Sequence, residues 1–187
     1  MSFGNIVLLI LVAIAGYIII IYNKFVSLRA GMDSSWSDID VQLKRRYDLI
    51  PALVDTVRGY KDYEASTLEN VIKARQQGVD ASTVKDQEKA ENMISAALGK
   101  LFALAEAYPD LKANQTFMKL QNELSGIEEA IQSARRYYNA IVRDNNAKTE
   151  SFPDLFVARK FNFEKRDYFE LDEDEAEDAQ KMPKIDL

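Results

Sequence analysis

The side chains able to do chemistry in this sequence are carboxylates, amines, guanidinium groups, amides and hydroxyls, because the chain has neither cysteine nor histidine. Thiol nucleophiles, imidazole acid–base catalysis and most zinc sites are therefore excluded. A di-iron bundle, which pairs its glutamates with Glu-x-x-His motifs, is excluded as well. The sequence also contains no Walker loop and no G-x-G-x-x-G motif.

Carboxylates alone could still bind Mg²⁺ or Ca²⁺, and the candidates are Glu128, Glu129 and the acidic C-terminal residues. Adjacent residues of a helix point in different directions, however, and no EF-hand spacing is present. We therefore expect no enzyme, no metal site and no cofactor.

The basic run at residues 44–46, "KRR", allows two interpretations. With Asp40 and Asp48, Lys44 forms an exposed charge ladder at four-residue spacing, in which each pair adds only about 0.2–0.5 kcal/mol. The alternative is a partner-binding patch. A direct lipid contact is disfavoured, because Arg45 lies roughly 35 Å beyond Tyr22 along a continuous helix, whereas charge at a membrane surface is screened within about 8 Å.

Pro51 follows this run inside an apolar stripe that keeps its helical phase across the proline. Proline cannot donate to the carbonyl of Tyr47, and inside a helix it costs about 3 kcal/mol. We interpret Pro51 as a helix kink within one helix, with a moving hinge as the alternative.

The N-terminus carries no charged side chain through Asn23, and residues 6–22 form an unbroken apolar run. As a helix this run is roughly 25 Å long, and the flanking aromatic residues extend it to the thickness of a bilayer. A cleaved signal peptide and a buried core helix are the alternatives, but no basic residue precedes the run and it is apolar on all sides. We therefore predict a single transmembrane anchor at residues 1–26.

Charge distribution bears on topology and partners. Lys24 and Arg29 follow the anchor, so the positive-inside bias places the rest of the chain in the cytoplasm. Residues 170–187 carry eight acidic and two basic side chains, which account for the whole net charge of −6. We expect this acidic tail to be disordered. The balanced charge of the body indicates that nucleic acid is not a partner.

Apolar periodicity after the anchor predicts an all-α fold with four helical stretches. The first carries a stripe of Trp36, Ile39, Leu43, Tyr47, Ile50, Val54 and Val57, with Gly59 as its stop signal. The second runs from about Asp62 to Gly78, and Ser82 or Thr83 is the candidate N-cap of the third. The third stripe is Met93, Ala97, Leu101, Leu104 and Tyr108, followed by a turn or helix start at Pro109.

The fourth stretch, residues 114–148, has a heptad-like, coiled-coil seam: Phe117, Leu120, Leu124, Ile127, Ile131, Ala134, Tyr138 and Ile141. Short connections then predict an antiparallel up-and-down four-helix bundle with long first and last helices. The bundle domain spans residues 27–169. It ends in an aromatic cover folded back on the helices, or alternatively in a peptide that docks on another protein, made of Phe152, Phe156, Phe161, Phe163, Tyr168 and Phe169.

Five motifs in this order resemble the LemA family. They are "YNKFVSLRAGMDSSWSDIDVQLKRRYDLIPALVDTVRGY", "TLENVIKAR", "AEAYPDLKANQTFMKLQNELSGIE", "YYNAIVRDNN" and "FPDLFVARKFNFEKRDYFE", and together they span residues 22–170. Two departures stand out: Ala52 replaces the Asn common in the family, and Tyr63-Glu64 replaces a His-Glu pair. Any polar function of those family residues is in doubt here.

The resemblance implies a bacterial, single-pass protein of the inner membrane with a cytoplasmic helical domain and no established enzymatic activity. We expect a scaffold or adaptor whose partners are the bilayer and other membrane proteins, with a membrane metalloprotease and a second copy of the chain as candidates. A membrane-tethered small-ligand or lipid-binding sensor is the alternative. The candidate interaction residues in the family-like motifs are Arg45, Arg46, Asp48, Asp110, Lys112, Asn114 and Gln121.

Overall fold

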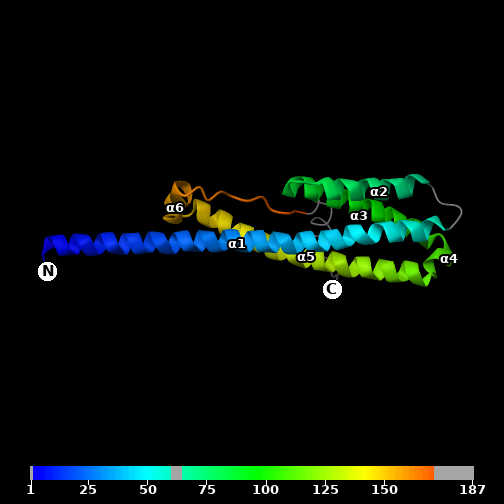
Figure 1. The fold of residues 1–187 in the computed structure, drawn as a ribbon, viewed down its shortest axis with the longest axis horizontal. Helices are drawn as coiled ribbons and strands as arrows, with labels where there is room; N and C mark the ends of the chain where they lie inside the picture. Colours follow the sequence, from blue (N-terminus) through cyan, green and yellow to red (C-terminus); the bar gives the residue numbers. More distant parts are fainter. Residues whose placement is uncertain (1, 60–64, 171–187) are drawn as a thin grey trace, which may run out of the picture. The chain divides into compact units, whose positions relative to one another are not determined.

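The computed structural model describes residues 2–59 and 65–170, and within these ranges the chain forms helices and no strands. The all-α prediction is confirmed. The helices are α1 (Phe3–Arg58), α2 (Ala65–Asp80), α3 (Val84–Glu106), α4 (Pro109–Lys112), α5 (Gln115–Glu150) and α6 (Asp154–Lys160), as Figure 1 shows. The predicted acidic tail, apart from Glu170, and the predicted start of the second helix lie outside the described residues.

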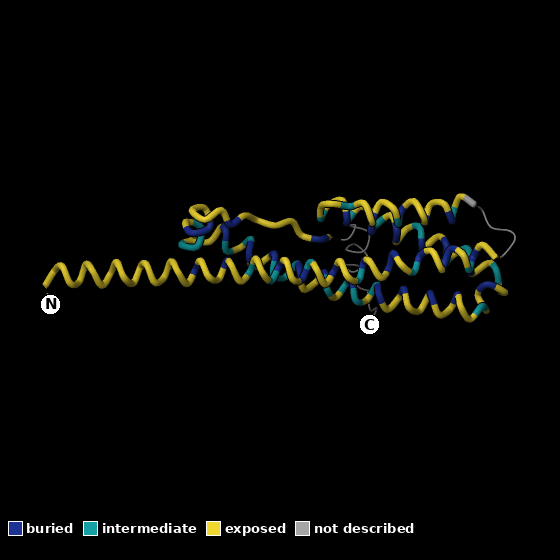
Figure 2. The backbone as a smooth tube through the Cα atoms, in the orientation of Figure 1, coloured by how far each residue is buried: buried dark blue, intermediate teal, exposed yellow. Residues whose placement is uncertain are grey.

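Helix α1 runs without interruption through the predicted anchor and the first soluble stretch. It is the one helix of the described chain that is long and apolar enough to cross a membrane, and only 6% of its most apolar 18-residue window is buried. Figure 2 shows this exposure along the N-terminal part of α1. Apolar side chains exposed over such a length are typical of a segment that contacts lipid or another apolar surface.

Helix starts follow the capping signals in the sequence. Thr83 is the N-cap of α3, since its hydroxyl accepts the backbone N–H of Asp86 at 3.1 Å. Pro109 occupies the first turn of α4. The Asn114 side-chain oxygen accepts the N–H groups of Thr116 and Phe117 and so begins α5. Of the two predicted caps of α3, Thr83 is the correct one.

The apolar stripe predicted for the third helix is wrong in register. Met93 is exposed, and the buried face of α3 consists of Gln87, Ala90, Glu91, Ile94, Leu98, Leu101 and Ala105. Only Leu101 belongs to both sets. Hydrophobicity alone misplaces the face because two polar side chains, Gln87 and Glu91, are buried among its apolar ones.

The described chain divides into two compact units, each described by itself. The first comprises residues 1–39 and 133–168, and there α6 packs on α1: Ile21, Phe25, Val157, Ala158 and Phe163 form one buried cluster. Asn162, at φ 55°, reverses the chain after α6, and the Phe163 N–H donates to the Ala158 carbonyl as in a Schellman cap. Asparagine suits this position because it tolerates the left-handed conformation.

An extended segment, residues 163–168, follows α6 and is here called the strap. Polar side chains of α5 hold its backbone. Asn145 donates to the Glu164 carbonyl at 3.0 Å, and the Asn146 amide both donates to the carbonyl and accepts from the N–H of Arg166. The Tyr138 hydroxyl donates to the Asp167 carbonyl at 3.1 Å.

The predicted aromatic cover is only partly a cover. Phe163 is buried in the first unit and Phe169 in the second. Phe152 and Phe156 are exposed instead, since the side of α6 that faces α1 is filled by Val157 and Ala158. Phe161 is also exposed, although one edge of its ring packs against Tyr22.

The second unit comprises residues 40–132 with Phe169 and Glu170. In this unit, a side chain of α2 binds the backbone carbonyl that the proline of α1 leaves without a helical donor. Pro51 lies inside α1 and the helix continues to Arg58. Because Pro51 has no N–H, the Tyr47 carbonyl loses its helical donor. Arg75 of α2 supplies a replacement, donating from Nε to that carbonyl at 2.7 Å. The proline thus creates an acceptor that joins α1 to α2.

A double-mutant cycle tests whether the Arg75 side chain replaces the backbone donor that Pro51 lacks. We expect Arg75→Met to lower the free energy of unfolding of the full chain by about 1–3 kcal/mol, because it leaves a buried carbonyl unsatisfied. In a Pro51→Ala background the backbone N–H regained at position 51 restores the helical bond, so the same substitution should cost clearly less. Urea unfolding in detergent, followed by circular dichroism, measures both. Lys73→Met on α2 is the control, and equal costs in the two backgrounds would contradict the exchange.

Candidate functional site

A buried ion network lies in the second unit, centred on Arg46 of α1. Its guanidinium Nη1 lies 2.9 Å from Glu91 Oε2 of α3 and 3.1 Å from Glu128 Oε2 of α5. Its Nη2 donates to Ser95 Oγ at 3.0 Å. One guanidinium therefore binds groups on two other helices, which its forked donor geometry allows.

The hydroxyl of Tyr47 extends this network. It donates to Glu91 Oε1 and accepts from Gln87 Nε2 at 2.5 Å. Gln87 also donates to Glu91 at 3.2 Å, so the carboxylate accepts from Arg46, Tyr47 and Gln87. The two bonds from Arg46 and Tyr47 fix the position of α3 against α1.

Burial governs the titration of both acids in this network. Desolvation by burial raises the pKa of Glu91 from its usual 4.5, and this outweighs the lowering effect of Arg46 and of the hydrogen-bond donors. Burial, followed by the nearby Glu91 charge, also raises the pKa of the Tyr47 hydroxyl far above its normal value of 10.0. Tyr47 is therefore protonated at neutral pH and donates its hydrogen bond to Glu91.

Gly78 of α2 provides the space that Tyr47 occupies. A Cβ at this position would lie 2.6 Å from the Tyr47 hydroxyl oxygen and 3.1 Å from Cδ1 of Ile94. The ring would have to move for any larger residue to fit. The second helix, predicted to end at about Gly78, continues to Asp80, and Gly78 is a packing position inside it.

A groove of about 380 Å³ opens beside Arg46, between α3 and α5. Its apolar part is formed by Leu98, Phe102 and Leu124, with Gly99 between them. Its polar part is formed by Arg46, Ser95, Gln121, Ser125, Glu128 and Gln132. Apolar walls with a few fixed polar groups are what a bound peptide or helix requires.

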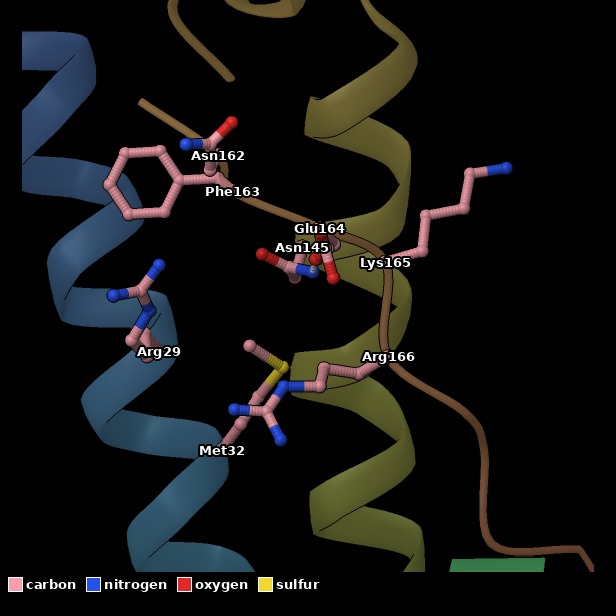
Figure 3. A pocket seen from close by; sticks show the side chains of 8 residues that line it. All are labelled: Arg29, Met32, Asn145, Asn162, Phe163, Glu164, Lys165 and Arg166. Atoms are coloured by element: carbon pink, nitrogen blue, oxygen red, sulfur yellow. Dashed lines mark hydrogen bonds between the residues drawn. The ribbon is translucent and has the colours of Figure 1, made fainter. Parts of the chain in front are cut away.

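A second pocket, also of about 380 Å³, lies in the first unit between α1, α5 and the strap (Figure 3). Arg29 and Met32 reach into it from α1, and Asn145 reaches from α5. The Arg29 guanidinium lies 4.8 Å from the ring centre of Phe163, a cation–π contact. Arg166 donates to Asp33 at 3.3 Å. The pocket is polar: Glu164 and Lys165 also line it, and Lys165, like Arg166, is paired with an acid, Glu150. Arg29 is the cation of this lining for which an anion is a suitable ligand.

The predicted interaction residues separate into two groups. Arg46 and Gln121 line the same groove. The other five lie outside this groove. Arg45 donates to Gln42 at 3.2 Å, and Lys112 lies 3.7 Å from Glu106. Asn114 caps α5, and Asp48 and Asp110 are exposed. The three residues of the predicted charge ladder, Asp40, Lys44 and Asp48, are exposed, whereas Arg46 in the same basic run is buried.

Sequence reasoning missed Tyr47, Gln87, Glu91 and Gly78 as members of this site. A signal existed for two of them, because Gln87 and Glu91 are four residues apart, on the same face as Ile94 and Leu98. In the part of the chain that the structure describes, no group of three or more acidic side chains is placed to bind a metal ion.

These features define a class of protein: a chain of long helices with an apolar N-terminal helix, a buried ion network and open surface pockets. A family model described as "LemA family" matches residues 35–186. The chain belongs to the LemA family.

Named relatives are distant in sequence but extensive in coverage. The chain is 28% identical over 159 residues to Protein LemA of Metamycoplasma hominis, covering 84% of this chain and 72% of that protein. It is 24% identical over 185 residues to Magnetosome protein MamQ 2 of Paramagnetospirillum magneticum and to Magnetosome protein MamQ of Magnetospirillum gryphiswaldense. In both cases 85% of this chain and 68% of the relative are covered.

The raised pKa of Glu91 predicts how stability depends on pH. The folded state binds this proton more tightly than the unfolded state, so the contribution of Glu91 is greatest below pH 4.5 and is lost as pH rises through the raised value. We expect the unfolding free energy of wild type, measured relative to Glu91→Gln, to fall with rising pH by at most about 1.4 kcal/mol per pH unit. Urea titrations at several pH values measure this, with Glu123→Gln as control. A difference that increases with pH would contradict it.

Proposed function

We propose that this LemA-family protein is a non-enzymatic scaffold anchored in the bacterial inner membrane by the first part of α1. Support for the anchor is the uninterrupted run of exposed apolar side chains along residues 6–20. Lys24 and Arg29, just after this run, favour a cytoplasmic position for the remainder of the chain.

The second unit supplies the binding surface of the proposed scaffold. Its helices α1, α2, α3 and α5 form an antiparallel up-and-down bundle in this proposal, consistent with the contacts that Arg46, Arg75 and Tyr47 make between them. The observation that carries the function is the groove between α3 and α5, in which Arg46 and Gln121 lie beside the apolar side chains of Leu98, Phe102 and Leu124. A segment of a partner membrane protein, for which a membrane metalloprotease is one candidate, binds there.

Groove occupancy is testable in living cells. We expect a photoreactive amino acid at Gln121 or Ser125 of the full-length chain to give discrete crosslinked products, since both positions line the groove. The same group at Glu123, exposed on α5 but outside the groove, is the control. Mass spectrometry identifies the partner and the side of the membrane on which it lies.

Two glycines provide a matched pair for blocking the groove. A Cβ at Gly99 or at Gly126 would meet nothing within 4 Å, but only Gly99 lines the groove. Gly99→Trp should therefore abolish the product from Gln121, whereas Gly126→Trp should leave it intact. Equal products from all positions, or insensitivity to Gly99→Trp, would reject the groove as the binding site.

The Arg29 pocket favours a second candidate function, a membrane-tethered sensor of a small anion or an anionic lipid headgroup. Under this alternative the full chain, purified in mild detergent, retains a stoichiometric anionic ligand in native mass spectra. Arg29→Gln should release it, because the guanidinium in the pocket is lost. Arg143→Gln, an exposed position on α5, is the control. Ligand-free wild type would reject the sensor and leave the scaffold standing.

A further inference from the structure

Three phenylalanines are exposed around α6: Phe152 in the turn from α5, Phe156 inside the helix and Phe161 at its C-terminal end. Phe152 is 81% exposed, Phe156 62% and Phe161 45%. The rings of Phe152 and Phe156 contact each other edge to face, with centres 5.8 Å apart. These three residues are here called the aromatic corner. Aromatic side chains exposed together on one surface mark an interaction site.

The aromatic corner is tied to the end of the apolar run of α1. Val157 and Ala158 of α6 are buried with Ile21 and Phe25 in the cluster described above. The ring centre of Phe161 lies 4.9 Å from that of Tyr22. Helix α6 therefore lies against α1 at residues 21–25, in the first unit, as Figure 1 also shows.

The position of residues 21–25 sets the depth of α6 relative to a bilayer. A hydrocarbon core is about 30 Å thick and takes about 20 helical residues. Counted from Phe3, such a span ends at Tyr22, the last residue of the apolar run. An element packed on Ile21 and Phe25 then lies at the boundary between acyl chains and headgroups, where aromatic residues are favoured.

The exposed side of α6 carries positive charge, which suits a position among anionic headgroups. Phe156, Arg159 and Lys160 are exposed, and the two basic residues follow the phenylalanine at spacings of three and four. The acid of this element, Asp154, pairs with Lys148 at 3.0 Å, so the outer side is aromatic and cationic. Aromatic and basic residues on one side of a helix are typical of elements that lie in an anionic membrane surface.

We propose that the aromatic corner inserts into the same membrane that α1 crosses, as a second, interfacial contact with anionic lipid. The inference rests on the membrane anchor of the proposed function and adds a lipid-binding surface to it. Its role is to hold α6 and the neighbouring strap at the membrane surface, with Phe152 and Phe156 among the acyl chains and Arg159 and Lys160 among the headgroups.

Fluorescence quenching by brominated lipid tests the insertion on the full chain. The chain has a single tryptophan, so Trp36→Phe provides a silent background. In that background Phe156→Trp and, separately, Phe152→Trp keep an aromatic ring at the aromatic corner. The variants are reconstituted in vesicles of phosphatidylglycerol and phosphatidylcholine with brominated acyl chains. We expect the indole of each variant to be strongly quenched by the bromolipid and protected from aqueous iodide.

Two control positions distinguish the failure of this inference from failure of the anchor. Tyr17→Trp places the indole within the apolar run, where bromolipid should quench it. Tyr137→Trp places it at an exposed position on α5, roughly 20 Å from the end of that helix, where only iodide should quench it. If bromolipid does not quench the Tyr17→Trp variant, the membrane anchor itself is rejected.

The inference is wrong if bromolipid quenches the Tyr17→Trp variant while the Phe152→Trp and Phe156→Trp variants respond only to iodide, because the aromatic corner is then in water. It is equally wrong if both quenchers fail on these two variants, because another protein segment then covers the aromatic corner. Replacing phosphatidylglycerol by neutral lipid should weaken the bromolipid effect on Phe156→Trp, because the attraction of Arg159 and Lys160 is lost.

Discussion

A charge removed from water must be met by opposite charge, and in this protein that requirement falls on Arg46. Its guanidinium is satisfied only when Glu91 and Glu128 are both within reach, which brings α1, α3 and α5 together at one point. Removing either carboxylate would leave part of this charge uncompensated, so the network specifies one arrangement of the helices and disfavours shifted ones. Apolar stripes alone allow neighbouring helices to slide by a turn.

Tyr47 links this electrostatic constraint to a backbone constraint. Its hydroxyl belongs to the Glu91 network, while its carbonyl, released by Pro51, accepts from Arg75. Its ring fits only because Gly78 has no side chain. Pro51, Arg75 and Gly78, which look unrelated along the chain, thus all help to hold Tyr47 in place. Pro51 therefore contributes to helix packing, through the Tyr47 carbonyl that it leaves free to accept from Arg75.

Much of the architecture could be predicted from the sequence, because it depends on local signals. The helical periodicity of α1 and α5, the Thr83 cap and the Pro109 helix start all act within a few residues. The site could not be predicted in the same way. Nothing local singles out Glu91, because a carboxylate on an apolar face makes sense only once its partner Arg46, 45 positions away, is known.

The aromatic residues near the C-terminus show the same limit. Their density correctly indicates that some of them avoid water, but composition does not say which surface takes each ring. The structure buries Phe163 and leaves Phe152 and Phe156 on the outside of a turn. An exposed side chain of a membrane protein faces either water or lipid. For Phe152 and Phe156, the neighbouring apolar run of α1 is what favours lipid.

The strap is held through its backbone, and this has an evolutionary consequence. Asn145 and Asn146 donate to the main-chain carbonyls of Glu164 and Arg166, and Asn146 also accepts from the Arg166 N–H, as a neighbouring β-strand would. Most side-chain replacements at Glu164 and Arg166 leave these backbone bonds untouched, whereas Phe163 of the strap is also constrained by its buried side chain. Proline at position 166 is the exception, because it has no hydrogen to give to Asn146.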